Sequence, residues 1–488
     1  MFKNLITNII KASKTTSTIS LSKKPFSAMA NIKVYSEPKD HENPKMDPFI
    51  ISTTTGFLPR MDPIVDMPAK YRVVDSLLDR MRWNQPDGSL GLLAKHQFGE
   101  AVHAELTELD FSEAPEDMML TMALYRDYCF LASAYLLEDC HHNYVKSGKY
   151  GLGRALLPKN IAKPLVRLAE IIQMKPFMEY NSGYALNNYF RKNKNEGVNI
   201  DNIDIKRSFV NIKSEAGFIL VHVAINQHSG NLVKAGMNLL KAAADNNRKG
   251  FNAAVTLIRD TLIYMNQEFE RMYIESNPND YNIFRTFILG IQNQPMFPSG
   301  VIYEGCFNNQ PQQFRGESGA NDSIIPFCDN IIQVTQNLPK NPLTDILRDF
   351  RTYRPKPHQD FLADTEKAAC EASVLEYGRK DPESLVGLLE VADQIRAFRH
   401  RHWILTNLYI LNFSKHPVAT GGSPIVTWLP NQLLTVIDYI KSNAQLLEGI
   451  ELPSGLAYNY NAILKRAMAD ERIIRREVAS RNKVIPER

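Results

Sequence analysis

The segment from Val391 to Leu411 (VADQIRAFRHRHWILTNLYIL) constrains the fold most, because its pattern requires a long helix with a histidine on the apolar face. It contains neither Pro nor Gly, and its apolar residues recur at helical intervals of three and four: Val391, Ile395, Phe398, Leu405 and Tyr409. His402 belongs to the same face, whereas His400 is turned about 200° away at ~100° per residue. An inward imidazole is a satisfied core residue, a metal ligand or a catalytic base, and this segment alone leaves all three open.

Composition limits the class of protein. The chain has 488 residues, of which 44% are hydrophobic and 23% charged, enough for two or more globular domains. Its five cysteines include no CxxC pair, which argues against a disulfide framework or a cysteine zinc site and favours a reducing compartment. No apolar run approaches the roughly 20 residues that span a bilayer, so we expect a soluble protein.

The first thirty residues differ from the rest of the chain. They carry five lysines and no acidic residue, with many Ser and Thr, which resembles a mitochondrial transit peptide or a disordered basic tail. We therefore expect the protein in the cytoplasm, or in mitochondria if residues 1–30 act as a transit peptide. Without this segment the 57 basic residues become 52, against 53 acidic ones, and this near-neutral balance gives no support for nucleic-acid binding.

Helical spacing dominates the remainder, which predicts an all-α fold. Residues 1–47 are interpreted as the basic segment followed by a linker of low order. A small helical domain is expected over 48–200 and a large one over 201–450. The boundary falls within the polar run RKNKNEGVNIDNIDIKR, and a basic helical tail covers 451–488.

Further features indicate the lining of a pocket. His222 lies in the apolar part of a helix that opens with Ser214, so a second inward histidine is available. Arg285 is the only charge among the apolar residues of IFRTFI, where it either reaches solvent or forms a fork for a buried carboxylate. The loops FRGESGA and ATGGSP contain glycines that allow backbone to approach a ligand, although each is also compatible with a plain loop.

The order of these pieces, from about residue 56 to 441, resembles the indoleamine 2,3-dioxygenase family of haem enzymes. The matching motifs are LLPKNIAKP, GFILV, FRTFILG, GVIYEGC, FRGESGANDS, YRPKPHQDFL, RHRHWILTNLYI and ATGGSPI. The resemblance implies a small N-terminal helical domain packed on a large C-terminal helical domain that holds haem b. It extends neither to residues 1–47 nor to the tail from about residue 451.

The resemblance also implies roles for individual residues. His402 matches the proximal ligand of the haem iron, and Arg399 matches an arginine that pairs with a haem propionate. Arg285 matches the arginine that holds the substrate carboxylate. The remaining residues on the substrate side come from several segments. Ser318 and Gly319 match the loop over the haem, and Thr420, Gly421 and Gly422 match a loop that closes on the substrate. Tyr281 is a further match, and Tyr184 is a weaker one.

The implied reaction inserts both atoms of O2 across the indole C2=C3 bond of L-tryptophan or another indoleamine, to give N-formylkynurenine. A monomer is expected, with no partner beyond substrate and O2. An alternative is a protein of the same fold that binds O2 on haem without oxygenating an indole.

Two positions depart from the family pattern. Asp280 stands where one of two substrate-packing aromatic residues is usual, next to Tyr281. His222 occupies a distal position that is commonly Ser, and we interpret it as a distal catalytic residue that accepts a hydrogen bond from the indole N–H, or alternatively as a packing residue.

Overall fold

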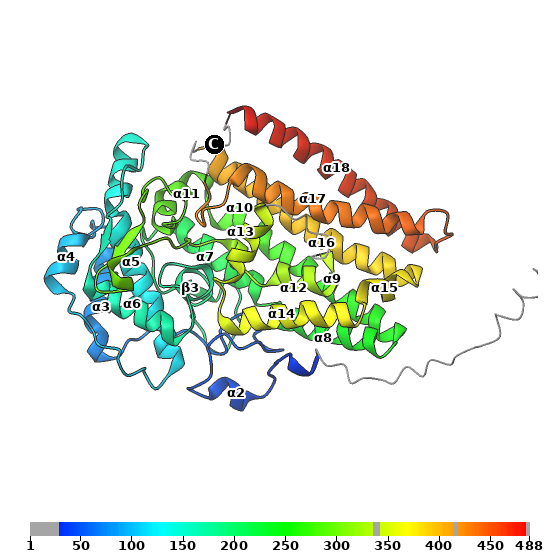
Figure 1. The fold of residues 1–488 in the computed structure, drawn as a ribbon, viewed down its shortest axis with the longest axis horizontal. Coiled ribbons are helices and arrows are strands. Elements are labelled where there is room, and N and C mark those ends of the chain that lie inside the picture. Colours follow the sequence, from blue (N-terminus) through cyan, green and yellow to red (C-terminus); the bar gives the residue numbers. More distant parts are fainter. Residues whose placement is uncertain (1–28, 335–341, 414–417, 485–488) are drawn as a thin grey trace, which may run out of the picture.

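The computed structural model describes residues 29–334, 342–413 and 418–484, and these residues are predominantly helical (Figure 1). The predicted all-α class is confirmed. Nearly all of the basic segment 1–30 lies outside the described residues. None of the described helices carries an apolar stretch long enough to cross a membrane.

Helices far outnumber strands along the described chain. The helices are η1 (Met29–Asn31), α2 (Pro38–Glu42), η2 (Ala69–Tyr71), α3 (Arg72–Met81), α4 (Phe98–Glu105), α5 (Met118–Ser147), α6 (Lys159–Ile171), η3 (Tyr180–Tyr184), α7 (Lys213–Asn226), α8 (Ser229–Ala244), α9 (Arg248–Glu270), α10 (Met272–Glu275), α11 (Pro278–Arg285), η4 (Thr286–Ile288), η5 (Phe307–Asn309), η6 (Gly319–Asn321), α12 (Ile324–Ile331), α13 (Pro342–Arg351), α14 (Lys356–Glu371), α15 (Val374–Arg379), α16 (Pro382–Thr406), η8 (Asn407–Leu411), α17 (Ile425–Ala444), η9 (Gln445–Leu447) and α18 (Ser454–Val484). The strands are β1 (Leu156–Leu157), β2 (Tyr189–Arg191), β3 (Ile203–Ile205), β4 (Val301–Tyr303) and β5 (Pro311–Gln312).

The strands form only two small sheets. One has the order β1-β4-β5, with β1 and β4 parallel and β4 and β5 antiparallel. The other is the antiparallel pair β2-β3, in which Tyr189 lies opposite Ile205. The β2-β3 pair lies within the predicted domain boundary, and the division there stays a prediction.

Helix α5 organises the N-terminal half, where α3, α4 and α6 pack against it (Figure 1). Asp117 caps its start by accepting the N–H of Met119, and Gly148 ends it in the left-handed conformation at φ 71°. Most of its side chains are buried all round, which fits a helix at the centre of a core rather than on a surface. Because α5 also packs against η3 and η4, the two halves share one continuous core.

The predicted linker is more ordered than expected. Residues 29–47 contain η1 and α2, and the Tyr35 N–H donates to the Ile51 carbonyl at 2.8 Å. The side chains of Met29, Ile32 and Val34 pack against the core. Polar composition concealed these few apolar anchors, which are sufficient to hold the segment on the protein surface.

Helix α16 organises the C-terminal half and confirms the helix predicted from residue 391. It packs against α9, α17 and α18, after starting at the Asp381 cap. The regular helix ends at Thr406, and the chain continues to Leu411 as a π-helical turn. Such turns are frequent at functional sites because they rotate one part of a helical face relative to the next.

The C-terminal tail is part of the fold. Helix α18 lies along α16 and α17 (Figure 1). The Glu477 carboxylate accepts the indole N–H of Trp403 at 2.6 Å, and Asp470 pairs with both Arg396 and His400. These contacts hold the outer face of α16, the face opposite the apolar stripe that the sequence predicts.

A buried ion cluster joins α3 and α5 to the start of the C-terminal half. Asp127 lies 2.6 Å from Arg207 and 2.9 Å from Arg126, and Arg207 also contacts Asp75. Burial alone would raise the pKa of Asp127, but the two arginines outweigh it and hold this pKa at about 2. The cluster is therefore ionised in the folded protein throughout the neutral range.

We expect Asp127→Asn to lower the free energy of unfolding by about 3–5 kcal/mol, because two buried guanidinium groups lose their shared counter-ion. Since the folded pKa is depressed, this stabilisation is complete above the unfolded value of 3.8 and disappears as pH falls toward 2. Denaturant unfolding at several pH values measures both effects. Asp345→Asn, which removes an exposed partner of Arg348, is the control and should change stability little. Equal losses in the two variants would contradict this role.

Candidate functional site

One large cavity lies inside the C-terminal half, at its border with η3. Its lining comes from α7, η3, α11, α16 and α17, and from the loops that contain Ser318 and Thr420. About 1770 Å³ of empty space lies among these residues, with the open solvent at the mouth included.

His402 projects from α16 into this cavity, as its place on the apolar face predicts. Burial lowers its pKa to about 4, and the neighbouring His222 lowers it further in the same direction. The imidazole is thus neutral near pH 7, the form that binds a metal. Neither ring nitrogen has a hydrogen-bond partner among the described residues, so the second-shell acceptor usual for a metal-bound histidine is not found there.

His222 lies on the same cavity, on α7. Its Nδ1 is 2.7 Å from the Phe218 carbonyl oxygen, so Nδ1–H is the donor and Nε2 is left as an acceptor. Burial lowers the pKa of His222, although the bond to Phe218 and the charge of Asp322 oppose that shift. The prediction of two inward histidines is therefore confirmed in position, and both are neutral near pH 7.

An aromatic wall lies beside His222. The Phe218 ring centroid is 4.9 Å from that of His222 and 5.2 Å from that of Tyr281, and the Tyr281 ring also contacts Tyr409 at 5.8 Å. Phe218, Tyr281 and Tyr409 all line the cavity. Asp280 is directed elsewhere and accepts a hydrogen bond from Ser214 at 2.6 Å, so it places no carboxylate against the aromatic wall.

The two predicted loops meet at the cavity. Ser318, Gly319 and Thr420 line it, and a Cβ on Gly319 would lie 4.0 Å from Nε2 of His222. Gly421 and Gly422 do not line it. A Cβ on Gly421 would come within 2.6 Å of the Phe350 ring, and Gly422 has φ +80°, so both glycines allow the loop to pack and turn.

Arg285 is completely buried, one turn after Tyr281 on α11, and is not among the residues that line the cavity. Its Nη2 donates to the Val418 carbonyl at 3.1 Å, while Nε and Nη1 have no partner. The solvent-exposed alternative for this arginine is wrong. A buried guanidinium without an anion among the described residues is costly, and this indicates a binding place for an anionic group.

Tyr184 does not reach the cavity. Its ring packs in an aromatic cluster with Phe130 at 6.0 Å and with Phe209 and Phe218 at 6.4 Å each. Tyr180, at the start of η3, lines the cavity instead. The motif YNSGY contains both tyrosines, and only the π-helical conformation of η3 decides which one faces inward.

A polar network that the sequence did not indicate lines the cavity beside Tyr180. Asp322 accepts hydrogen bonds from the Tyr180 hydroxyl at 2.9 Å and from the Asn226 amide at 2.7 Å, and all three residues line the cavity. Glu317, next to the predicted Ser318, also lines it. The only available signal was their presence within the motifs YNSGY, VAINQ and FRGESGANDS.

Two arginines with unused donors lie at another part of the cavity lining. Arg399 pairs with Asp329 at 2.5 Å and keeps Nη1 without a partner. Arg354 is fully buried, and its Nη1 is also without a partner. Burial lowers the pKa of Arg354 to about 9, and the nearby Arg351 lowers it further, so the group remains cationic at pH 7. These unused donors are suited to a ligand carboxylate.

Haem fits this set of residues. A neutral imidazole without a protein partner faces a spacious cavity, which is lined largely by apolar side chains such as Phe269, Leu405 and Leu429. The two unused arginine donors match the propionates that a haem carries. Of the two histidines on this cavity, His402 has neither ring nitrogen bonded to a described residue, whereas Nδ1 of His222 is bonded to the Phe218 carbonyl.

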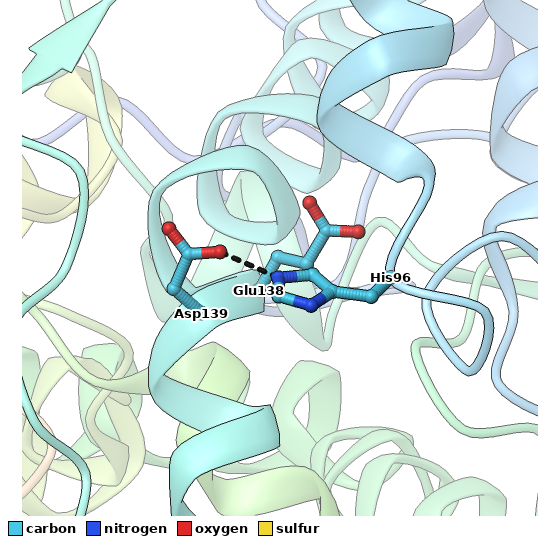
Figure 2. Close-up of side chains that lie close together, drawn as sticks. All are labelled: His96, Glu138 and Asp139. Carbon is cyan, nitrogen blue, oxygen red and sulfur yellow. Dashed lines mark hydrogen bonds and ion pairs between the residues drawn. The ribbon is translucent and has the colours of Figure 1, made fainter.

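A second cluster of possible metal ligands lies far from the cavity and is structural. His96, Glu138 and Asp139 come together where the segment before α4 meets α5 (Figure 2). His96 lies 2.7 Å from Asp139, and Glu138 accepts the Phe98 and Gly99 N–H groups at 2.8 and 3.0 Å. Arg154 pairs with both acids, so one of their two negative charges is already offset.

Fold and site together define an all-helical protein whose cavity offers a histidine and arginine donors that would hold a haem. Comparison with known proteins identifies the family. The indoleamine 2,3-dioxygenase family matches residues 45–430, and the chain belongs to that family, whose members are haem-dependent dioxygenases. The match ends within α17, before α18.

Individual relatives are distant. The chain is 26% identical to indoleamine 2,3-dioxygenase 1 of Rattus norvegicus over 55% of its own length and 65% of the relative, just under two thirds. It is 27% identical to a 6-hydroxytryptophan 2,3-dioxygenase of Fusarium equiseti, over 65% of its own length and 72% of the relative. It is 24% identical to a myoglobin of Haliotis diversicolor, over 79% and 96%.

Proposed function

We propose that the protein is a haem dioxygenase that inserts O2 across the indole C2=C3 bond of L-tryptophan to give N-formylkynurenine. The observation that carries this proposal is a pair of neutral histidines, one from α16 and one from α7, on a single cavity with unused arginine donors. In this assignment His402 binds the haem iron and Arg399 a propionate. Ferrous haem, when bound, supplies the centre at which O2 is activated.

The other residues bind and orient the indole. Phe218 and Tyr281 give it an aromatic wall, and Nε2 of His222 accepts its N–H. Arg285, which follows Tyr281 by one turn of α11, holds the substrate carboxylate, with Thr420 and Ser318 closing the polar end. Burial of these groups excludes water, which strengthens each polar contact and holds the indole in one orientation.

The direct test is turnover of L-tryptophan by the ferrous protein in the presence of O2, followed by the absorbance of N-formylkynurenine. Product formation supports the dioxygenase. A second candidate, reversible O2 binding without oxygenation, is favoured by the similarity to the Haliotis myoglobin over most of both chains. A stable oxygenated spectrum that persists in the presence of L-tryptophan would support that candidate and contradict the first.

We expect His402→Ala to weaken haem retention at least about tenfold, because the iron loses its protein ligand. His400→Ala is the matched control on the same helix. Its imidazole pairs with Asp470 on α18, and the variant should keep the histidine-ligated Soret band. Haem stoichiometry and the visible spectrum of both variants measure the difference. A normal Soret band in His402→Ala would show that another residue binds the iron.

Arg285→Ala should raise the KM for L-tryptophan by about 30-fold or more, because loss of one partner of a buried charge pair costs about 2–5 kcal/mol. Haem content should stay near that of the unchanged protein, since Arg285 is not among the residues that line the cavity. Arg285→Lys keeps the charge without the planar fork, so its KM for L-tryptophan should lie between those of the unchanged protein and Arg285→Ala. Equal KM values in all three proteins would exclude Arg285 from carboxylate binding.

Turnover should fall as pH drops through the pKa of His222, because protonation converts the Nε2 acceptor into a donor. Burial lowers that pKa below the ordinary value of 6.5, so the loss is expected only on the acid side of 6.5. His222→Ser should remain active with a flatter acid limb and a weaker preference for L-tryptophan over 1-methyltryptophan, which lacks the N–H. The pH dependence of kcat/KM for both substrates measures this. An unchanged profile and preference would mean that His222 only packs.

A further inference from the structure

Four glutamates are buried in the described part of the chain, and three of them have satisfied carboxylates. Glu138 accepts two backbone N–H groups and pairs with Arg154. Glu179 accepts three backbone N–H groups at 2.6–2.7 Å, and Glu215 accepts three at 2.7–3.0 Å. The fourth, Glu317, is 3% exposed, and its carboxyl has neither a hydrogen bond nor an ion pair among the described residues.

Among the described residues, the groups that interact electrostatically with Glu317 are acidic. It lines the cavity from the loop before η6, and the titratable groups that interact with it are Glu179, with Tyr180 and Tyr184 of η3, and Tyr281 of α11. Burial raises the pKa of Glu317 to about 8, and the charge of Glu179 raises it further in the same direction. In the ligand-free protein at pH 7 this carboxyl is therefore mostly protonated.

A complementary charge also acts on Tyr281. The buried, anion-free guanidinium of Arg285 and the cation-free carboxyl of Glu317 both interact electrostatically with the Tyr281 side chain. They do not pair with each other. A ligand that offers one negative and one positive group a short distance apart would satisfy both, and an α-amino acid carries such groups on a single carbon.

We propose that Glu317 is the counter-ion for the α-ammonium group of an amino-acid substrate bound in this cavity. This inference rests on the proposed function and adds the amino group to the features that the site recognises. A cation suits Glu317 better than a neutral donor, because the carboxyl lies beside a second buried acid, and only positive charge offsets that repulsion. The pocket then selects zwitterionic indoles over indole acids.

The proposal requires a proton to leave on binding. The free protein holds a protonated carboxyl for about nine molecules in ten at pH 7, given a pKa near 8. The complex holds a carboxylate facing an ammonium, so binding of an ammonium ligand releases about one proton to solvent. Indole-3-propionate, which lacks the amino group, leaves the carboxyl protonated and releases none.

Isothermal titration calorimetry of the ferric haem-loaded protein measures this release without turnover. Titrations at pH 7 in buffers of different ionisation enthalpy give the number of protons exchanged for L-tryptophan and for indole-3-propionate. We expect Glu317→Gln to abolish the release and to weaken L-tryptophan binding at least about tenfold, with little change for indole-3-propionate. Because Gln mimics the protonated carboxyl, the variant should fold and hold haem normally.

Asp322→Asn is the matched control. It removes another cavity-lining carboxylate, one that Tyr180 and Asn226 already satisfy, and the proton release should persist. Equal proton counts for the two ligands in the unchanged protein would overturn the proposal, and this comparison needs no variant. Proton release without formation of N-formylkynurenine would instead retain Glu317 as the ammonium partner and reject the dioxygenase.

Discussion

The cost of burying charge controls this site. A carboxylate or guanidinium away from water must find a partner, and the described core satisfies nearly all of its own with backbone N–H groups or opposite charges. Glu179, Glu215 and the Asp127 cluster show how completely this is done. Several exceptions lie at one cavity: unused donors on Arg354 and Arg399, and the unpaired carboxyl of Glu317. Arg285 and Arg60 also keep unused donors, outside the lining of that cavity.

The need of buried polar groups for partners also explains how helix α16 is built. Its inner face carries His402 into an apolar cavity, while its outer face binds α18 through Trp403, His400 and Arg396. The histidine can remain unpartnered because the surrounding contacts, not its own hydrogen bonds, hold the helix in place. Helix α18 contributes these contacts from outside the region that matches the family.

Close packing of backbone against backbone is a second constraint, and it acts on the loops that contain Ser318 and Thr420. A Cβ on Gly316 would lie 2.3 Å from the Gly290 nitrogen and 2.7 Å from the Thr420 carbonyl oxygen. Three segments therefore meet backbone to backbone, and the Gly290 N–H donates to that same carbonyl at 2.9 Å. The glycines of FRTFILG and FRGESGANDS are required by this junction, which brings Thr420 and Ser318 to the cavity together.

The sequence by itself determined the all-helical class and the inward direction of His402 and His222, because periodic burial along a helix depends on local spacing. It also predicted the loops of Ser318 and Thr420 through short motifs. Only the tertiary structure decided that Tyr180 rather than Tyr184 reaches the cavity, that Arg285 is buried outside the cavity lining, and that α18 covers α16. Glu179 and Glu317 differ locally: residues 181–183 donate three backbone N–H groups to Glu179, whereas Glu317 receives none from the described residues. The sequence does not predict that Glu317 lies at the wall of a cavity, because the residues that line this cavity come from distant parts of the chain.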